Sequence, residues 1–391
     1  MSAQSRTLYL DYHATTPVDS RVLEEMLPYF MQAWGNAASK DHRYGAAAKT
    51  IVEESREEIA GLIGARTAEI VFTSGATESN NLALVGVARA NAPERGHIIT
   101  SAIEHPAVLD PLIELGAEGL EVTVLPVDSV GRVAPEDVAN AIRPDTLLVS
   151  VMAANNEVGT LEPLDEIGDI TRSAGVLLHT DATQALGYVD IDVRELGVDL
   201  LSGSAHKLYG PKGAGFLFVS GRDPRVKLSP LLRGGDHEAG RRSGTLNVPG
   251  IVGLAAAMRW AATLRDSECS RLRELTEYMF SQFESEVGDV RRNGDAGDRL
   301  PNNLNVGFRG VRAKSLVVSL PDLAFSTGSA CSTAKAEPSH VLKALGLSDE
   351  EVRESVRFGL GRSTTRDDVD YAVNRIAQVV ARIRSAKRGV A

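Results

Sequence analysis

Short apolar runs alternate with helix-like stretches over much of the first half of the chain, from about residue 57 to residue 217. Each run ends in small or polar residues, which is typical of buried strands. The runs are Ile70–Phe72, His97–Thr100, Val122–Leu125, Leu147–Val151 and Val176–His179. Strands that alternate with helices predict an α/β fold with a mostly parallel sheet and helices on both faces.

The second half of the chain predicts a smaller α/β unit. The expected elements are a long helix over Gly250–Val287, strands over Asn303–Phe308 and Val356–Leu360, and a helix over Asp367–Ala386. The length of 391 residues is enough for two domains. We therefore expect a large domain over residues 15–262 and a small domain formed by residues 1–14 and 263–391.

A lysine and an aspartate follow two of the apolar runs in the first half. Lys207 comes before a glycine-rich turn, and Asp181 closes the run that begins at Val176. In parallel sheets ligands bind beyond the carboxyl ends of the strands, so the two side chains are expected in one site. An amine beside an anion suits pyridoxal 5'-phosphate, which has an aldehyde and a basic ring nitrogen. Taken singly, each residue also fits a surface or helix-capping role.

Two further strand ends carry residues that such a cofactor needs. Gly75, Ala76 and Thr77 lie where a strand turns into a helix, and a helix N-terminus binds phosphate. His105 follows the strand that begins at His97, where an imidazole can stack on a pyridine ring. These positions predict a phosphate site and a ring site at the same sheet edge as Asp181.

The chain has two cysteines, and they lie in different surroundings. Cys269 belongs to a charged, helix-like segment, whereas Cys331 lies in a small, polar, aperiodic stretch that ends at Pro338. A stretch of this kind predicts a loop. A thiol in a polar loop can act as a nucleophile if a neighbour such as Lys335 or His340 favours the thiolate. The alternative is a small apolar residue without chemistry.

Taken together, these segments resemble cysteine desulfurases of the class-V aminotransferase group, which are fold-type I enzymes dependent on pyridoxal 5'-phosphate. The likeness runs nearly end to end, and it rests on Tyr9–Pro17, Phe72–Ser79, Glu104–His105, Asn155–Gly159, Asp181–Gln184, Ala205–Lys207, Arg242–Thr245 and Ser329–Ser332. It implies a large domain with a mostly parallel sheet and a smaller C-terminal α/β domain that carries the Cys331 loop.

The resemblance implies a reaction in which L-cysteine becomes L-alanine and Cys331 takes the sulfur as a persulfide. The sulfur would pass to an acceptor protein for iron–sulfur cluster assembly, tRNA thiolation or DNA phosphorothioation. Lys207 would bind the cofactor and act as a base. Other class-V enzymes remain as alternatives, namely an aminotransferase, a selenocysteine lyase or a cysteine lyase. A non-catalytic relative that only binds a sulfur acceptor is a third possibility.

The resemblance also assigns roles to single residues. His105 would stack on the ring and move protons, Gln184 would bind the ring oxygen, and Arg357 would bind the substrate carboxylate together with Asn36 and Asn156. Thr245 would reach the phosphate of a partner subunit, which implies a homodimer. The cofactor-binding residues implied are Ala76, Thr77, His105, Asn156, Asp181, Gln184, Ser204, His206, Lys207 and Thr245.

The chain departs from the family pattern at several points. Ala37 stands where proline is familiar, His13 where serine is common, and Ser202–His206 replaces a bulkier segment. The segment after the last predicted helix is shorter than the tail that docks iron–sulfur scaffolds, so scaffold docking through a tail is not expected here. The spacing from Cys331 to Pro338 resembles the long-loop group of these enzymes.

Composition limits the other classes of function. The net charge of −10 argues against direct binding to nucleic acid. No apolar stretch has the length of a membrane span, and the first residues lack the order of a signal peptide. Two cysteines give neither a disulfide framework nor a metal-ligand cluster, which fits the reducing cytoplasm. We therefore expect a cytoplasmic enzyme without a metal.

Overall fold

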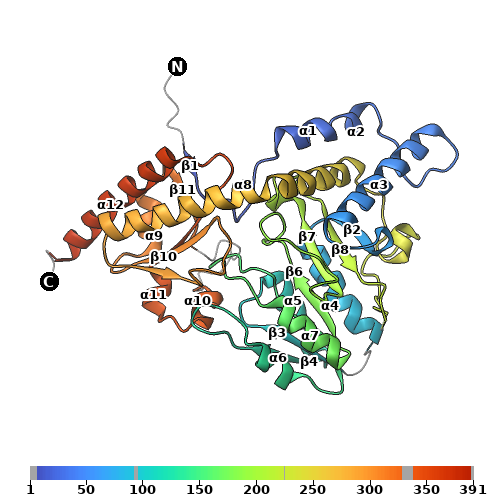
Figure 1. Cartoon of the computed structure of the whole chain (residues 1–391), viewed down its shortest axis with the longest axis horizontal. Helices are drawn as coiled ribbons and strands as arrows, with labels where there is room; N and C mark the ends of the chain where they lie inside the picture. The colour runs from blue at the N-terminus through green and yellow to red at the C-terminus, as the bar shows by residue number, and fades with distance from the viewer. Residues whose placement is uncertain (1–6, 92–95, 224, 328–337, 389–391) are drawn as a thin grey trace.

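The computed structural model describes residues 7–91, 96–223, 225–327 and 338–388. It is an α/β structure with a large sheet and a smaller α/β unit beside it (Figure 1). The large sheet has the order β2–β8–β7–β6–β5–β3–β4, and only β8 runs against its neighbours. Its strands are β2 (Ile70–Thr73), β3 (His97–Ser101), β4 (Glu121–Leu125), β5 (Thr146–Ser150), β6 (Leu177–Asp181), β7 (Leu200–Ser204) and β8 (Gly215–Val219). The mostly parallel sheet predicted from the apolar runs is confirmed.

Helices pack on this sheet, as the buried central strands β5 to β8 require, while the edge strand β4 is partly exposed. The helices that contact its strands are α3 (Arg43–Leu62), α4 (Ala76–Asn91), α5 (Pro106–Ala117), α6 (Pro135–Ala141) and α7 (Leu164–Ala174), whereas α1 (Ser20–Met26) and α2 (Pro28–Met31) pack on the long helix α8 (Val248–Glu286). The boundaries follow local chemistry. His105 caps α5 and Pro106 occupies its first turn, while Gly175 ends α7 in the left-handed conformation with a φ of 70°.

The smaller unit is built on a three-stranded antiparallel sheet of order β12–β10–β9. Its elements are β1 (Leu8–Tyr9), β9 (Val290–Asn293), β10 (Asn303–Phe308), α9 (Ala313–Ser319), β11 (Leu323–Ala324), α10 (His340–Ala344), α11 (Asp349–Arg353), β12 (Ser355–Gly359) and α12 (Arg366–Arg388). The N-terminal β1 pairs in parallel with β11, so the start of the chain lies on this unit.

The long helix α8 (Val248–Glu286) runs along both units (Figure 1). Its first part belongs to the hydrophobic cluster of the large sheet, where Leu254 is fully buried. Its later part belongs to a second cluster through Leu272, Met279 and Phe283, which pack with β10 and β12. The division into domains at residues 14 and 262 stays a prediction, and these two clusters are consistent with it.

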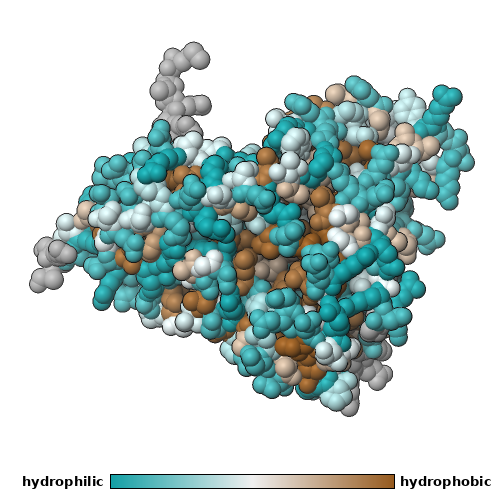
Figure 2. Space-filling model, viewed as in Figure 1, coloured by the Kyte–Doolittle hydropathy of each residue, from teal (hydrophilic) through white to brown (hydrophobic). Residues whose placement is uncertain are grey.

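Hydrophobic residues on the face shown in Figure 2 gather in the centre, between the two lobes, while the outer ends are mostly hydrophilic. The same central region holds the carboxyl ends of the large-sheet strands (Figure 1). Among the described residues, no helix combines the length and apolar character needed to cross a membrane.

Candidate active site

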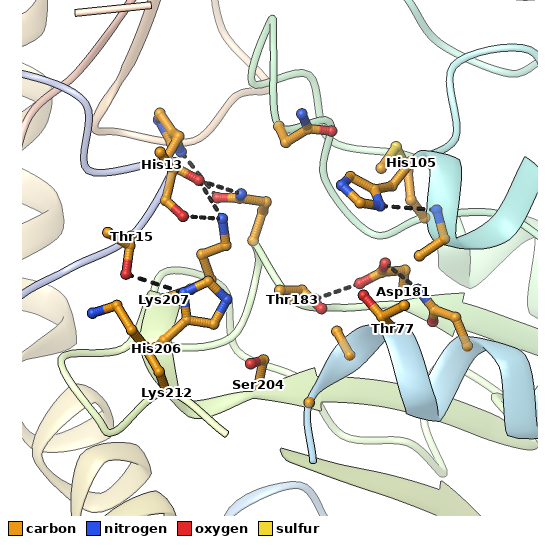
Figure 3. A pocket seen from close by; sticks show the side chains of 18 of the residues that line it. His13, Thr15, Thr77, His105, Asp181, Thr183, Ser204, His206, Lys207 and Lys212 are labelled. Carbon is orange, nitrogen blue, oxygen red and sulfur yellow. Dashed lines mark hydrogen bonds between the residues drawn. The ribbon is translucent and has the colours of Figure 1, made fainter. Parts of the chain in front are cut away.

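A pocket of about 460 Å³ opens at the carboxyl ends of β6 and β7 (Figure 3). It brings together most of the side chains predicted to form the site, which are Ala76, Thr77, His105, Asn156, Asp181, Gln184, Ser204, His206, Lys207 and Arg357. Asn36 and Thr245 are exposed and do not line it. Cys331 lies outside the described residues. The strand-end positions read from the sequence thus converge in space.

Lys207 lies in the 3₁₀ turn Ala205–Lys207, directly after β7. Its Nζ donates to the backbone oxygens of His13 and Ala14, at 2.5 and 2.8 Å. The chain then turns sharply, because Tyr209 has a φ of +63°, which is uncommon for a residue with a side chain. The ammonium group is therefore held in the pocket by the N-terminal segment, nearly two hundred residues away in sequence.

Asp181 ends β6 with a buried carboxylate. Its Oδ2 accepts from Asn80 Nδ2 at 2.7 Å, and its Oδ1 accepts from the backbone N–H of Thr183 at 2.9 Å. These two donors fix the carboxylate plane at the floor of the pocket (Figure 3). A fixed carboxylate in this place is suited to hold a protonated ring nitrogen.

His105 caps α5 and also faces the pocket (Figure 3). Its Nδ1 accepts the backbone N–H of Ala107 at 3.0 Å, so the proton of the neutral ring is on Nε2. Burial lowers the pKa of His105, with the positive charges of Lys207 and His340 acting in the same direction and Asp181 opposing them. The imidazole is therefore neutral near pH 7 and offers an N–H at Nε2.

The start of α4 forms the side of the pocket that suits an anion. A helix N-terminus leaves its first backbone N–H groups without intrahelical acceptors. Gly75 precedes the helix with a φ of +152°, and a Cβ on Gly215 would come within 2.6 Å of the Gly75 Cα. Two residues without side chains thus let this turn approach β8 closely. Ser204 and His206 lie opposite, as Figure 3 shows.

His206 is held by a contact that the sequence did not indicate. Its Nδ1 lies 3.2 Å from Thr15 Oγ1. Burial lowers the pKa of His206 to about 4, helped by the charges of Lys207 and Lys212. The ring is therefore neutral near pH 7, so it can offer an anion a hydrogen bond but no charge.

Arg357 lines the pocket from β12, on the small-unit side. The residue is 3 % exposed, and the guanidinium donates to Asp11 Oδ1 at 2.7 Å and to the backbone oxygen of Asn156 at 2.8 Å. A buried guanidinium suits a carboxylate ligand, although Asp11 already uses one of its N–H groups.

Several pocket residues were not predicted as part of the site. They include His13, Ala14, Thr15, Asn80, Thr183 and Lys212. His13 was noted only as a departure from a common serine. The segment Tyr9–Pro17 was used only for the family resemblance, and its polar, aperiodic part from His13 to Thr16 could have placed the N-terminal segment at a site.

The fold and the pocket define a class-V aminotransferase. The family model described as aminotransferase class-V matches residues 8–372. A protein from Anaeromyxobacter dehalogenans (strain 2CP-C) named cysteine desulfurase IscS is 51 % identical over 377 residues, covering 96 % of this chain and 93 % of that protein. The chain belongs to the class-V aminotransferase family, and within it to the cysteine desulfurases.

Solved structures agree with this placement. A structure titled NifS-like protein aligns with a TM-score of 0.89 and 36 % identity, over 96 % of this chain and 99 % of that chain. One titled "SspA in complex with cysteine" aligns with a TM-score of 0.80 and 38 % identity, over 90 % and 99 %. The fold class and family expected from the motifs are confirmed.

The family depends on pyridoxal 5'-phosphate, and the residues present fit this cofactor. The pocket has an amine at Lys207, a carboxylate fixed by two donors at Asp181 and a helix N-terminus flanked by neutral hydrogen-bonding groups. These three features match an aldehyde, a ring nitrogen and a phosphate. The dependence on pyridoxal 5'-phosphate predicted from the sequence is confirmed by the family.

Proposed function

We propose that the protein is a cysteine desulfurase that converts L-cysteine to L-alanine and passes the sulfur through Cys331 to an acceptor protein. One observation carries the proposal: Lys207, Asp181 and His105 converge in one pocket at the strand ends of a chain that is 51 % identical to a named cysteine desulfurase. The likeness to SspA, which was solved in complex with cysteine, supports L-cysteine as the substrate.

The bound cofactor supplies an aldehyde for amines and an electron-withdrawing ring that weakens bonds at the substrate α-carbon. Asp181 would hold the ring nitrogen protonated, and Gln184 would donate to the ring oxygen. Ala76 and Thr77 would bind the phosphate through the helix start, with Ser204 and His206 opposite.

Two side chains would move protons. Lys207 has an amine in the pocket, and His105 offers the N–H of a neutral ring at Nε2. The Lys207 amine, once released by the substrate, would take the α-proton, and His105 would give or take a proton on the other side. The lowered pKa of His105 keeps it neutral, so it can act without first losing a charge.

The sulfur step needs a thiolate. The Cys331 thiolate would attack the substrate sulfur, forming an S–S bond, while the C–S bond breaks and leaves its electron pair on carbon, which takes a proton. L-Cysteine and the enzyme thiol thus become L-alanine and an enzyme persulfide, with no external oxidant or reductant. A reducing cytoplasm would keep this thiol reduced between turnovers, so a cytoplasmic location is part of the proposal.

Recognition of the substrate carboxylate is assigned to Arg357 and Asn156, which line the pocket. Asn36 was predicted to join them, and its exposed side chain accepts the N–H of Ala38. It does not line the pocket, so its part in substrate binding stays a prediction.

A homodimer is the second part of the proposal. Thr245 is exposed and lies outside the pocket of its own subunit, which suits a residue that serves a partner. Large apolar side chains are exposed on and around α1 and α2, namely Leu23, Leu27, Phe30, Met31, Trp34 and Tyr44. A second copy of the chain would cover such a surface.

The dimer has a direct test. Mixed dimers of Lys207→Ala and Thr245→Ala subunits combine one intact lysine with one intact threonine in a single site. If Thr245 serves the partner, the mixture recovers activity that neither variant has alone. No recovery in mixed dimers of verified size would contradict shared sites.

The central test of the function measures alanine and enzyme-bound, reductant-labile sulfur formed from L-cysteine. The wild type should form both, and Cys331→Ala should lose the bound sulfur, while Cys269→Ala serves as a matched control for a cysteine in α8. If Cys331→Ala turns over cysteine as well as the wild type, the protein is a direct lyase or an aminotransferase instead.

A further inference from the structure

His13 fills a space beside β12 that a glycine provides. Alternate residues of a strand point to the same face, so Arg357 and Gly359 share the face of β12 that Arg357 turns toward the pocket. A Cβ on Gly359 would lie 2.8 Å from His13 Cδ2. The imidazole is 2 % exposed and occupies the room that a larger residue at 359 would take.

On its other side, His13 holds both ends of the Gln184 amide. The His13 Nδ1 lies 2.9 Å from Gln184 Oε1, and Gln184 Nε2 donates to the His13 backbone oxygen at 3.1 Å. Since Oε1 can only accept, Nδ1 must carry the proton of the neutral ring. These two contacts fix the orientation of the Gln184 amide, with its NH₂ group at the His13 backbone oxygen. The second N–H of that group remains for a ligand in the pocket.

The imidazole is a permanent donor in this arrangement. Burial lowers the pKa of His13 to about 3, and the charges of Arg357 and Lys207 act in the same direction while the bond to Gln184 opposes them. The ring therefore stays neutral across the range in which an enzyme is assayed. The same backbone oxygen of His13 also accepts from Lys207 Nζ, so one residue contacts both cofactor-facing groups.

We propose that His13 is a positioning residue that orients the Gln184 amide so that an N–H, and not the carbonyl, faces the cofactor ring oxygen. This inference rests on the proposed function, since it assigns a partner to Gln184 in that same site. A flipped amide would set Gln184 Oε1 against the His13 backbone oxygen and the Gln184 NH₂ group against the Nδ1 donor, so the backbone and the ring of His13 both oppose the flip, and only the ring contribution is lost when the side chain is replaced. The competing explanation is that His13 only fills the space beside Gly359.

The test compares variants of the cofactor-loaded enzyme. His13→Asn keeps an N–H donor near the position of Nδ1, whereas His13→Leu keeps bulk without a donor. The readout is the pH midpoint of the visible absorption band of the bound cofactor, which responds to a hydrogen bond at the ring oxygen. His13→Leu should raise this midpoint by about one unit, the size expected for one such bond, and His13→Asn should stay near the wild type.

Coupling to Gln184 separates positioning from packing. In a Gln184→Leu background, His13→Leu should add no further shift, because the donor that it orients is already gone. Equal shifts in both backgrounds, or a wild-type midpoint for His13→Leu, would overturn the inference. His13→Ala replaces His13→Leu if the latter fails to fold by circular dichroism.

Failure of the proposed function would look different. A wild type without a visible band that depends on Lys207, or without alanine formation, would remove the function itself. If the wild type has this band and forms alanine, but the His13 variants keep the wild-type pH midpoint, only the positioning role of His13 is refuted.

Discussion

Replacing Glu238 by alanine should destabilise the protein far from the pocket. The Glu238 carboxylate accepts two N–H groups of Arg56, both at 2.7 Å, and the backbone N–H of Phe72 at 2.8 Å. The side chains of Arg56 and Glu238 are 9 % and 2 % exposed. The pair thus ties the loop before α8 to α3 and β2 in a setting with little solvent screening.

The expected loss of unfolding free energy follows from the buried Arg56 charge that Glu238→Ala leaves without its main partner. Removing one partner of a buried ion pair costs about 3–5 kcal/mol, because the other charge stays buried. Glu53, half exposed, still contacts Arg56 at 3.2 Å and reduces the loss, so we expect about 3 kcal/mol for Glu238→Ala. The matched control is Asp169→Ala, whose exposed pair with Arg172 should contribute less than about 1 kcal/mol.

Urea unfolding at fixed protein and cofactor concentrations measures both free energies, since ligands and subunit association shift apparent stability. The double variant Arg56→Met/Glu238→Met should lose less than Glu238→Ala, because it buries no unpaired charge. A loss below about 1 kcal/mol for Glu238→Ala would refute the reasoning that this pair is a desolvated unit.

Other predictions concern the pocket and its surroundings. Arg357→Lys should raise the KM for L-cysteine about 10- to 100-fold in the alanine assay, since a lysine cannot form the planar fork; an unchanged KM would contradict the carboxylate role. Burial raises the pKa of Glu104 from 4.5 to about 8, so the unfolded chain loses this proton at lower pH than the folded protein does. Stability from Glu104 therefore falls as pH rises from about 4.5 to 8, and Glu104→Gln should flatten the Tm-against-pH curve, whereas parallel curves would argue against it. Gly359→Ala should cost about 1–3 kcal/mol in urea unfolding, because its Cβ would overpack against the His13 ring and against the backbone nitrogens of His13 and Tyr12. The added change His13→Ala removes only the ring contact, so it should relieve only a minor part of that cost.

The sequence predicted the parts of the fold that depend on short-range patterns. A strand that is buried on both faces appears in the sequence as a short continuous apolar run. Each run expected from the sequence coincides with a strand of the large sheet. The antiparallel placement of β8 between β2 and β7 was not predicted, because strand order depends on contacts between distant segments. The pairing of β1 with β11 is of the same kind, with more than three hundred residues between the two strands.

The site divides in the same way. Asp181, Lys207 and His105 were predicted because each follows its own strand, and parallel strands bring such ends together. Asn80 directly follows the motif Phe72–Ser79, and Thr183 lies within the motif Asp181–Gln184. Both were missed because their part is to hold Asp181, and only geometry shows that contact. His13 and Thr15 were missed because a polar residue in an irregular segment has no period that indicates where it will lie.

The N-terminal segment connects pocket residues that come from different strands. Asp11 binds Arg357 on β12, His13 binds Gln184 after β6, and Thr16 accepts from the backbone of Tyr209 while donating to that of His206 after β7. A single stretch of chain therefore contacts the groups assigned to substrate carboxylate, ring oxygen and phosphate. Substitutions within it should show non-additive effects with those in the pocket, because residues that share a partner do not contribute independently to binding or stability.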